Sequence, residues 1–235
     1  MRTLSSWMTS SLVGALIAVT PAVAADAPQT QMSVDPWTGA PLGATLWDQT
    51  DSPAGAGFAS QTFAPVDAVF DCSSGDDFTI PAADVMWSVG SVFTPGTYLF
   101  GVGPTPLVDV EFFGDGAGVP GGAVCSYPGL VAGVDFTDAA GTLDITLPSP
   151  CVLPAGDYWV TVRAEMDQAV GGQWFWQMRS AQNGSVFAWE NPGDGFGTGC
   201  TAWTPAGACG AGSPDLLFSL SGAVVPVELQ SFDID

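Results

Sequence analysis

The stretch from residue 143 to residue 165 constrains the fold most, because two runs of alternating apolar and polar residues flank a break rich in proline. In the first run, Leu143, Ile145 and Leu147 alternate with polar residues, which is typical of a half-buried strand. In the second run, over residues 158–165, one face is again apolar. Proline cannot donate to a strand ladder and glycine tolerates a tight turn, so we expect the break to be a turn. The pattern predicts two antiparallel strands joined in one sheet.

Similar alternation recurs along the chain, and no stretch shows a sustained helical period. The spacing of strands and turn residues predicts an all-β fold, an antiparallel β-sandwich over residues 44–222. We expect residues 185–189 to pair with 173–179. Further strands are predicted at 85–92, 107–113 and 215–221. The side chains expected to face inward include Val108, Val110, Phe112, Trp174, Trp176, Met178, Leu216, Phe218 and Leu220.

The first 25 residues read as a secretory signal peptide. Arg2 supplies a positive start, residues 12–23 form a short apolar run, and Ala22-Val23-Ala24 offers a cleavage site of small residues. The run is shorter than the roughly 20 residues that a membrane-spanning helix needs. Residues 26–43 then form a lead, and residues 223–235 an extended C-terminal tail. The sequence predicts export and no transmembrane segment in the mature chain.

The charge is strongly one-sided. After cleavage two arginines, Arg163 and Arg179, stand against 24 carboxylates, a net charge of −22. Such a surface repels phosphate backbones, so we expect no nucleic-acid partner. Both arginines are expected to pair with nearby acids such as Asp109. Without histidine or lysine, the chain lacks the groups for histidine-based triads, histidine-bound metals and Schiff-base chemistry.

Five cysteines lie beyond the signal peptide, and in an exported chain they are expected to oxidise where geometry permits. Cys200 and Cys209 enclose a loop rich in glycine and are predicted to pair. Cys125 and Cys151, each at the edge of a predicted strand, form the second predicted pair. Cys72 is left over, either free or a sign that one of these pairs is wrong.

The order of turns and core residues resembles a jelly-roll-type sandwich module of secreted and surface-exposed bacterial proteins. The resemblance covers about residues 44–222 and rests on residues 76–81, 108–113 with 118–121, 153–160, Trp189 and 215–218. It implies fold and location rather than chemistry. Residues 226–229 resemble the linker that often precedes a sorting region in exported bacterial proteins.

Two kinds of binding site suggest themselves. Oxygen-rich glycine loops suit calcium, which binds carboxylates and carbonyls in flexible geometry. The candidate ligands are Asp76, Asp77, Asp109, Asp115, Asn191 and Asp194. Exposed aromatic rings next to amide and acidic groups suit the face of a sugar. The candidates for such stacking are Trp159, Trp189 and Trp203.

The predicted function is that of a non-enzymatic structural or adhesive protein, secreted or at the cell surface, with extracellular polysaccharide or surface and matrix proteins as partners. The alternative is a calcium-supported carbohydrate-binding module. A glycoside hydrolase that uses two carboxylates is third. Its candidate acids are Glu111, Glu165, Glu190 and Glu228, of which Glu111 and Glu165 fall on polar strand faces, where solvation also explains them.

Overall fold

The computed structural model describes residues 43–63, 65, 67–84 and 86–225. The predicted signal peptide, nearly all of the lead and residues 226–235 of the tail lie outside this part of the chain. Within it, strands extend from Ala44 to Val224. The three helices of the described part are short: η1 (Ala68–Phe70), α1 (Gln168–Gly171) and η2 (Ala206–Cys209). None of the described helices is long and apolar enough to cross a membrane.

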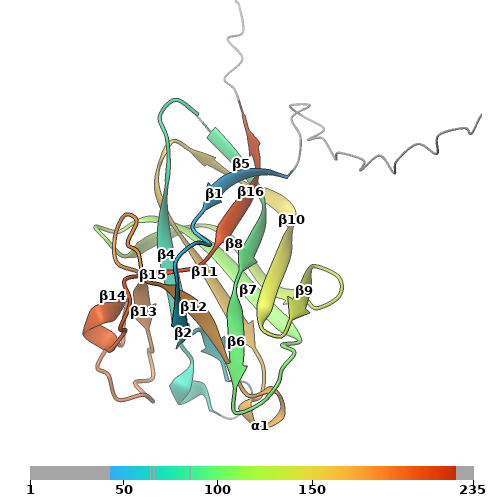
Figure 1. The fold of residues 1–235 in the computed structure, drawn as a ribbon, viewed down its shortest axis with the longest axis vertical. Helices are drawn as coiled ribbons and strands as arrows, with labels where there is room; N and C mark the ends of the chain where they lie inside the picture. The colour runs from blue at the N-terminus through green and yellow to red at the C-terminus, as the bar shows by residue number, and fades with distance from the viewer. Residues whose placement is uncertain (1–42, 64, 66, 85, 226–235) are drawn as a thin grey trace, which may run out of the picture. The chain divides into compact units, whose positions relative to one another are not determined.

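The predicted all-β class is confirmed: antiparallel sheets pack against one another in a sandwich-like arrangement (Figure 1). The five-stranded sheet has the order β1 (Ala44–Asp48), β16 (Ser219–Val224), β5 (Met86–Thr94), β10 (Thr142–Pro154), β9 (Phe136–Ala139). The seven-stranded sheet has the order β14 (Thr204–Pro205), β13 (Ala188–Glu190), β4 (Ser73–Ile80), β11 (Gly156–Glu165), β7 (Leu107–Asp115), β8 (Pro120–Val131). Its seventh strand, β3 (Gln61–Thr62), lies off this path and forms a short parallel pair with β11. The four-stranded sheet contains β15 (Asp215–Leu216), β12 (Gln173–Arg179), β2 (Pro53–Ala59) and β6 (Gly96–Leu99).

Aromatic side chains join the sheets in the core. Phe78 of β4 stacks on Trp87 of β5, with ring centroids 6.2 Å apart, and also contacts Phe112 and Tyr158. The inward faces that alternation predicted on β7, β12 and the 215–221 segment are all buried. Alternation therefore identified the core faces correctly, because every second residue of a strand points to the same side.

Both predicted disulfides are present. Cys125 of β8 pairs with Cys151 of β10 and so links the seven-stranded sheet to the five-stranded sheet. Cys200 pairs with Cys209 and closes the loop between β13 and η2. Cys72 is free and buried, and burial raises the pKa of its thiol to about 12.

The predicted hairpin between residues 143–147 and 158–165 is wrong. The first run belongs to β10, which pairs with β5 and β9, whereas β11 lies between β4 and β7 in the other sheet. The prolines do not end the strand, because β10 continues through a bulge to Pro154. Pro148 and Pro150 are tolerated because they lie in the bulge between the paired residues Thr146 and Cys151, where the ladder needs no N–H donor from them.

The predicted pairing of residues 185–189 with 173–179 is also wrong. β13 pairs with β4 and β14, while β12 pairs with β2, β6 and β15. The segment between β12 and β13 therefore does not form a tight hairpin. Instead it carries the chain from the four-stranded sheet to the seven-stranded sheet.

A buried carboxylate joins these two sheets. Asp76 lies on the inward face of β4 in line with Phe78, and is fully buried. Its Oδ2 accepts hydrogen bonds from Gln49 Nε2 at 2.7 Å and from the Leu216 N–H at 2.8 Å, and its Oδ1 accepts from the Asp77 N–H at 3.0 Å. Burial raises the pKa of Asp76 well above its usual value, and the nearby Asp215 carboxylate raises it further. One hydrogen-bond acceptor, the Asp76 side chain, thus joins β4 to β15 and to the segment after β1.

Asp215 is the second fully buried acid in this region. Its Oδ2 accepts from the Asn183 N–H and lies 3.4 Å from Arg179 Nη1. Arg179 also contacts the exposed Asp51 at 2.8 Å. Burial is the largest influence on Asp215 and raises its pKa to about 6, although the Asn183 N–H and Arg179 oppose the rise.

This raised pKa predicts a pH dependence of stability. An aspartate that titrates near 3.8 when unfolded and near 6 when folded favours the folded state below pH 3.8 and loses that contribution as pH rises through 6. Asp215→Asn keeps the acceptor but removes the titration. We expect the free energy of unfolding of the variant, relative to the wild type, to increase between pH 4 and pH 7 by on the order of 2 kcal/mol. Urea unfolding at several pH values measures it, and parallel curves for the two proteins would contradict the assignment.

The disulfides predict a second difference in stability. In the chain-entropy account, closing the 26-residue separation of Cys125 and Cys151 stabilises by about 3.5 kcal/mol, and closing the 9-residue separation of Cys200 and Cys209 by about 2.7 kcal/mol. Replacing both cysteines of the first pair by alanine is therefore expected to lower the urea midpoint more than the same change in the second pair. An equal or reversed order would show that native contacts outweigh loop closure.

Candidate functional site

The three predicted aromatic binding residues have different environments. Trp159 is 0% exposed. Its indole N–H donates to Asp115 Oδ1 at 3.0 Å, so the turn between β7 and β8 covers the outer face of β11 at this point. The prediction that Trp159 offers its ring to a ligand is therefore wrong. Trp203 is half-buried and packs edge-on against Phe113, at 6.1 Å between ring centroids.

The candidate calcium ligands belong to three separate groups: Asp76 with Asp77, Asp109 with Asp115, and Asn191 with Asp194. Asp76 points inward from β4, whereas the next residue, Asp77, points outward and accepts from the Ser185 N–H. Asp109 pairs with Arg163 at 2.7 Å, as predicted for that arginine, and Asp115 accepts from two backbone N–H groups of its own turn. Among the described residues, no group of three or more acidic, cysteine or histidine side chains is placed to hold a metal ion.

Asn191 and Asp194 shape a loop. The fully buried Asn191 donates from Nδ2 to the carbonyl oxygens of Val69 and Asp71, and its Oδ1 accepts from the Phe196 N–H. Asp194 Oδ1 accepts from the Gly199 N–H. Asn191 therefore ties the loop after β13 to helix η1, and this tie fixes the position of Phe196.

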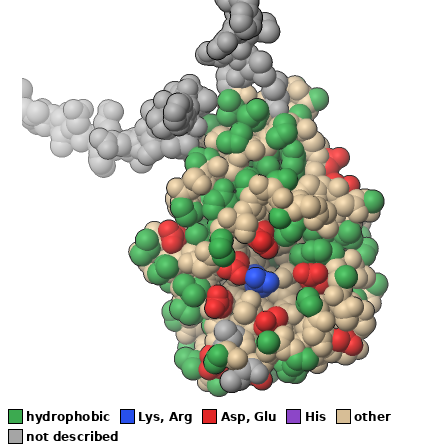
Figure 2. All heavy atoms as spheres, turned by 180° about the vertical axis from the view of Figure 1, so that it is seen from behind, with side chains coloured by type: hydrophobic (Ala, Val, Ile, Leu, Met, Phe, Trp, Pro, Cys, Tyr) green, Lys and Arg blue, Asp and Glu red, His purple; other side chains and the backbone are tan. Residues whose placement is uncertain are grey.

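Acidic side chains surround Arg163 on the outer face of β11. Figure 2 shows acidic groups distributed around a basic group on one face of the molecule. Around Arg163, the acids are Asp109, Glu111 and Glu190, and burial raises the pKa of Glu190 while Arg163 lowers it. Glu111 accepts from Ser126 Oγ at 3.1 Å on the neighbouring strand β8. The hydrolase candidates Glu111, Glu165 and Glu190 lie on strands β7, β11 and β13 of this sheet, and Glu228 lies outside the described residues.

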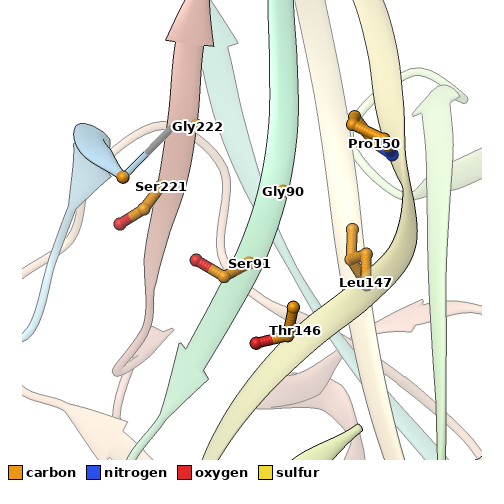
Figure 3. Close-up of a pocket in the computed structure, with 8 residues that line it drawn as sticks. Gly90, Ser91, Thr146, Leu147, Pro150, Ser221 and Gly222 are labelled. Atoms are coloured by element: carbon orange, nitrogen blue, oxygen red, sulfur yellow. The ribbon is translucent and has the colours of Figure 1, made fainter. Parts of the chain in front are cut away.

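A hollow of about 390 Å³ lies over the five-stranded sheet (Figure 3). Ser221, Ser91 and Thr146 are directly opposite one another on β16, β5 and β10, and their hydroxyls are turned the same way. Leu147 and Pro150, from the bulge of β10, form one side. The lining is made of small hydroxyl-bearing residues, glycine, leucine and proline.

A second concave region is lined mainly by aromatic rings, and we call it the aromatic groove. It consists of two adjoining hollows of about 250 and 140 Å³ that share Gln173 and Phe196. The larger is lined by Gly57, Phe58, Ala59, Gln173, Phe175, Trp189, Phe196 and Thr198. The smaller is lined by Phe63, Phe70, Gln168, Gln173 and Phe196. Trp189 is the one predicted aromatic residue that lines the groove, although little of its ring is exposed.

The rings of the groove pack mainly edge to face. Phe196 is 38% exposed and contacts Phe63, Phe70 and Trp189 at centroid distances of 6.2, 5.3 and 5.8 Å. Trp189 contacts Phe58 at 5.4 Å, and its indole N–H donates to the Ala59 carbonyl at 2.9 Å. Because the rings hold one another and the indole is tied to the backbone, the groove is preformed.

Gln173 is the polar group at the centre of the groove. It begins β12 on the face opposite Trp174, is 6% exposed, and lines both hollows. Its carboxamide makes no hydrogen bond to any described residue. It is also absent from the described side-chain groups that are fully enclosed and lack a hydrogen-bond partner, so its polar atoms keep some exposure. The amide therefore faces the open hollow. Thr198 adds a hydroxyl that accepts from the Cys200 N–H and keeps its own hydrogen available.

Sequence reasoning missed Phe58, Phe175, Phe196 and Gln173 as candidate site residues. One signal was present: Phe175 alternates with the inward Trp174 and Trp176, so it had to point away from the core. Phe196 lies in a glycine-rich loop with no period, and its position depends on tertiary contacts of Asn191 and of the neighbouring rings. Comparison with family models, with curated proteins and with solved structures finds no match for the chain.

Proposed function

We propose that this chain is exported through its N-terminal signal and acts outside the cytoplasm as a non-enzymatic structural or adhesive β-sandwich protein, at the cell surface or in the secreted milieu. In this proposal it is a jelly-roll-type module of the kind found in exported bacterial proteins. The two disulfides support an oxidising location. The mature net charge of −22 supports a highly solvated extracellular surface.

The proposal rests on the chemical nature of the residues that line the two larger hollows described above. The hydroxyl-lined hollow and the larger aromatic hollow are lined, within the described chain, by uncharged residues. Groups of this kind bind by contact and hydrogen bonding, whereas acid–base chemistry needs titratable groups at the site. The acids with the most strongly raised pKa values, Asp76 and Asp215, are instead committed to buried hydrogen bonds between strands and loops.

Both mature arginines serve structure in the same way. Arg163 pairs with Asp109, and Arg179 contacts Asp51 and Asp215. Each is occupied by acids of its own chain, which supports a binding function that does not depend on recognising an anion. A protein of this kind is expected to contribute to attachment or matrix integrity by adhesion.

Export and oxidation predict a specific mass and thiol count. We expect the chain recovered from outside the cytoplasm to begin at residue 25 or 26. It should react with one equivalent of an alkylating agent, at Cys72, and only after unfolding, because that thiol is buried. Intact-mass measurement before and after alkylation in denaturant provides the count. An uncleaved chain with five reactive thiols in its native location would overturn the proposal.

The non-enzymatic function predicts a pattern of complementation. Deleting the gene in its native host is expected to reduce surface attachment or matrix integrity, and the wild-type chain should restore it. The double variant Glu111→Gln/Glu165→Gln should restore it equally, because both acids lie on the partly exposed outer faces of their strands and adhesion needs no acid catalyst. Restoration by the wild type alone, together with release of sugars from a polysaccharide that the variant does not perform, would replace adhesion by hydrolysis.

A further inference from the structure

We propose that the aromatic groove is a binding site for a neutral pyranose sugar of an extracellular polysaccharide, held by aromatic rings on its apolar face and by Gln173 on its hydroxyl groups. The inference deepens the adhesive function and rests on it, since it names the ligand class through which the protein would adhere. It differs from the carbohydrate site predicted from sequence in two ways. Neither Trp159 nor Trp203 lines it, and it requires no calcium.

The charge of the site selects a neutral ligand. The described residues that line the groove are uncharged, while the mature chain carries a net charge of −22. Uronic, sulfated or phosphorylated sugars would be repelled by the whole protein without a local cation to hold them. A quaternary ammonium ion would be attracted by the net charge and by the rings, but no described carboxylate lines the groove to pair with it.

The rings suit the apolar face of a sugar. Phe175 and Phe196 are partly exposed, whereas Trp189 forms a nearly enclosed wall behind them. The face of an aromatic ring carries partial negative charge, and the C–H groups on one face of a pyranose carry partial positive charge. Stacking therefore buries apolar area and is electrostatically favourable. Edge-to-face packing keeps Phe196 in place without a ligand, which reduces the entropy lost on binding.

Gln173 is the observation that points to a hydroxylated ligand rather than an apolar one. A carboxamide presents two donors and an acceptor, which matches neighbouring hydroxyl groups that both donate and accept. The residue is more than nine-tenths buried, yet its amide has no partner among the described residues. A purely apolar ligand would cover this amide and leave it unsatisfied, at a cost of about 1–3 kcal/mol. A sugar would satisfy it, with Thr198 as a further donor.

The dimensions fit a short stretch of polysaccharide. The larger hollow, about 250 Å³, lies between β2, β12 and the loop after β13, and the smaller continues past Phe196 to Phe63 and Phe70. Together they reach the lower end of the range of about 300–1,000 Å³ typical of small-molecule sites. Gln168 at the far side of the smaller hollow offers a second amide to the next sugar in the chain.

Affinity electrophoresis of the mature chain, residues 26–235, tests the proposal. The gels contain one neutral polysaccharide each: mixed-linkage β-glucan, xylan, mannan, galactan or starch. We expect at least one to retard the wild type. Phe175→Ala and Phe196→Ala should each weaken that retardation at least tenfold. Gln173→Leu, which keeps the size but removes the amide, should weaken it about 5- to 30-fold, as expected for loss of hydrogen bonds to the ligand.

Phe100→Ala is the matched control. Phe100 is 81% exposed and lies outside the groove, so this variant should bind like the wild type. Melting curves confirm that each variant is folded, and Gln173→Leu remains decisive if either phenylalanine variant fails to fold. Tetramethylammonium and a short apolar peptide, each titrated by calorimetry, test the other ligand classes.

Three outcomes would overturn the sugar site: no retardation by any of the five polymers, unchanged retardation of folded groove variants, or saturable binding of the ammonium ion or peptide at the groove in place of sugar. The adhesive function is judged separately. If Gln173→Leu and Phe175→Ala fully restore attachment in the deletion strain, adhesion stands and the groove is not its site. If the wild type itself restores nothing, the proposed function fails whatever the gels show.

Discussion

The buried carboxylate of Asp76 is the interaction on which the arrangement of the sheets depends. It accepts N–H groups from three places: the side chain of Gln49 after β1, the backbone of Asp77, and the backbone of Leu216 in β15. An apolar residue there would leave these donors without a partner in a closed interior, where each loss costs more than the net value of a hydrogen bond. The polar centre therefore specifies how the four-stranded sheet meets β4, which hydrophobic packing alone would leave less defined.

The same logic explains the candidate site. Asn191, fully buried, uses its whole amide to connect η1 with the loop after β13, and Phe196 is held against the aromatic cluster as a result. The Cys200–Cys209 disulfide closes the far end of that loop. A binding surface made of loop residues is thus supported by buried hydrogen bonds and a covalent link, so its rings keep their positions although the loop has no regular structure.

The sequence predicted which side of β7, β12 and the 215–221 segment faces the core, but not which strands are neighbours. Alternation indicates which side chains are buried. It identified Val108, Val110 and Phe112 correctly, because the apolar face of a strand is buried whichever sheet the strand joins. Partner choice depends on contacts far apart in the chain, so the hairpin drawn through Pro148–Pro154 failed. The binding roles predicted for Asp76 and Trp159 were wrong for a related reason. The first is an acid on an inward face, and the second a ring on an outward face that a distant turn covers. Such tertiary compensation leaves no periodic signal.

The burial of Cys72 affects which disulfides the chain can form. Only the thiolate attacks a disulfide, and with a pKa of about 12 roughly one thiol in 10⁵ is ionised at neutral pH. Once its backbone has paired with Gln61, the odd cysteine is inert toward oxidants and small thiols in the surrounding medium. Burial of this one sulfur atom therefore removes the single unpaired thiol of the described chain from thiol–disulfide exchange, and so protects the two disulfides from rearrangement.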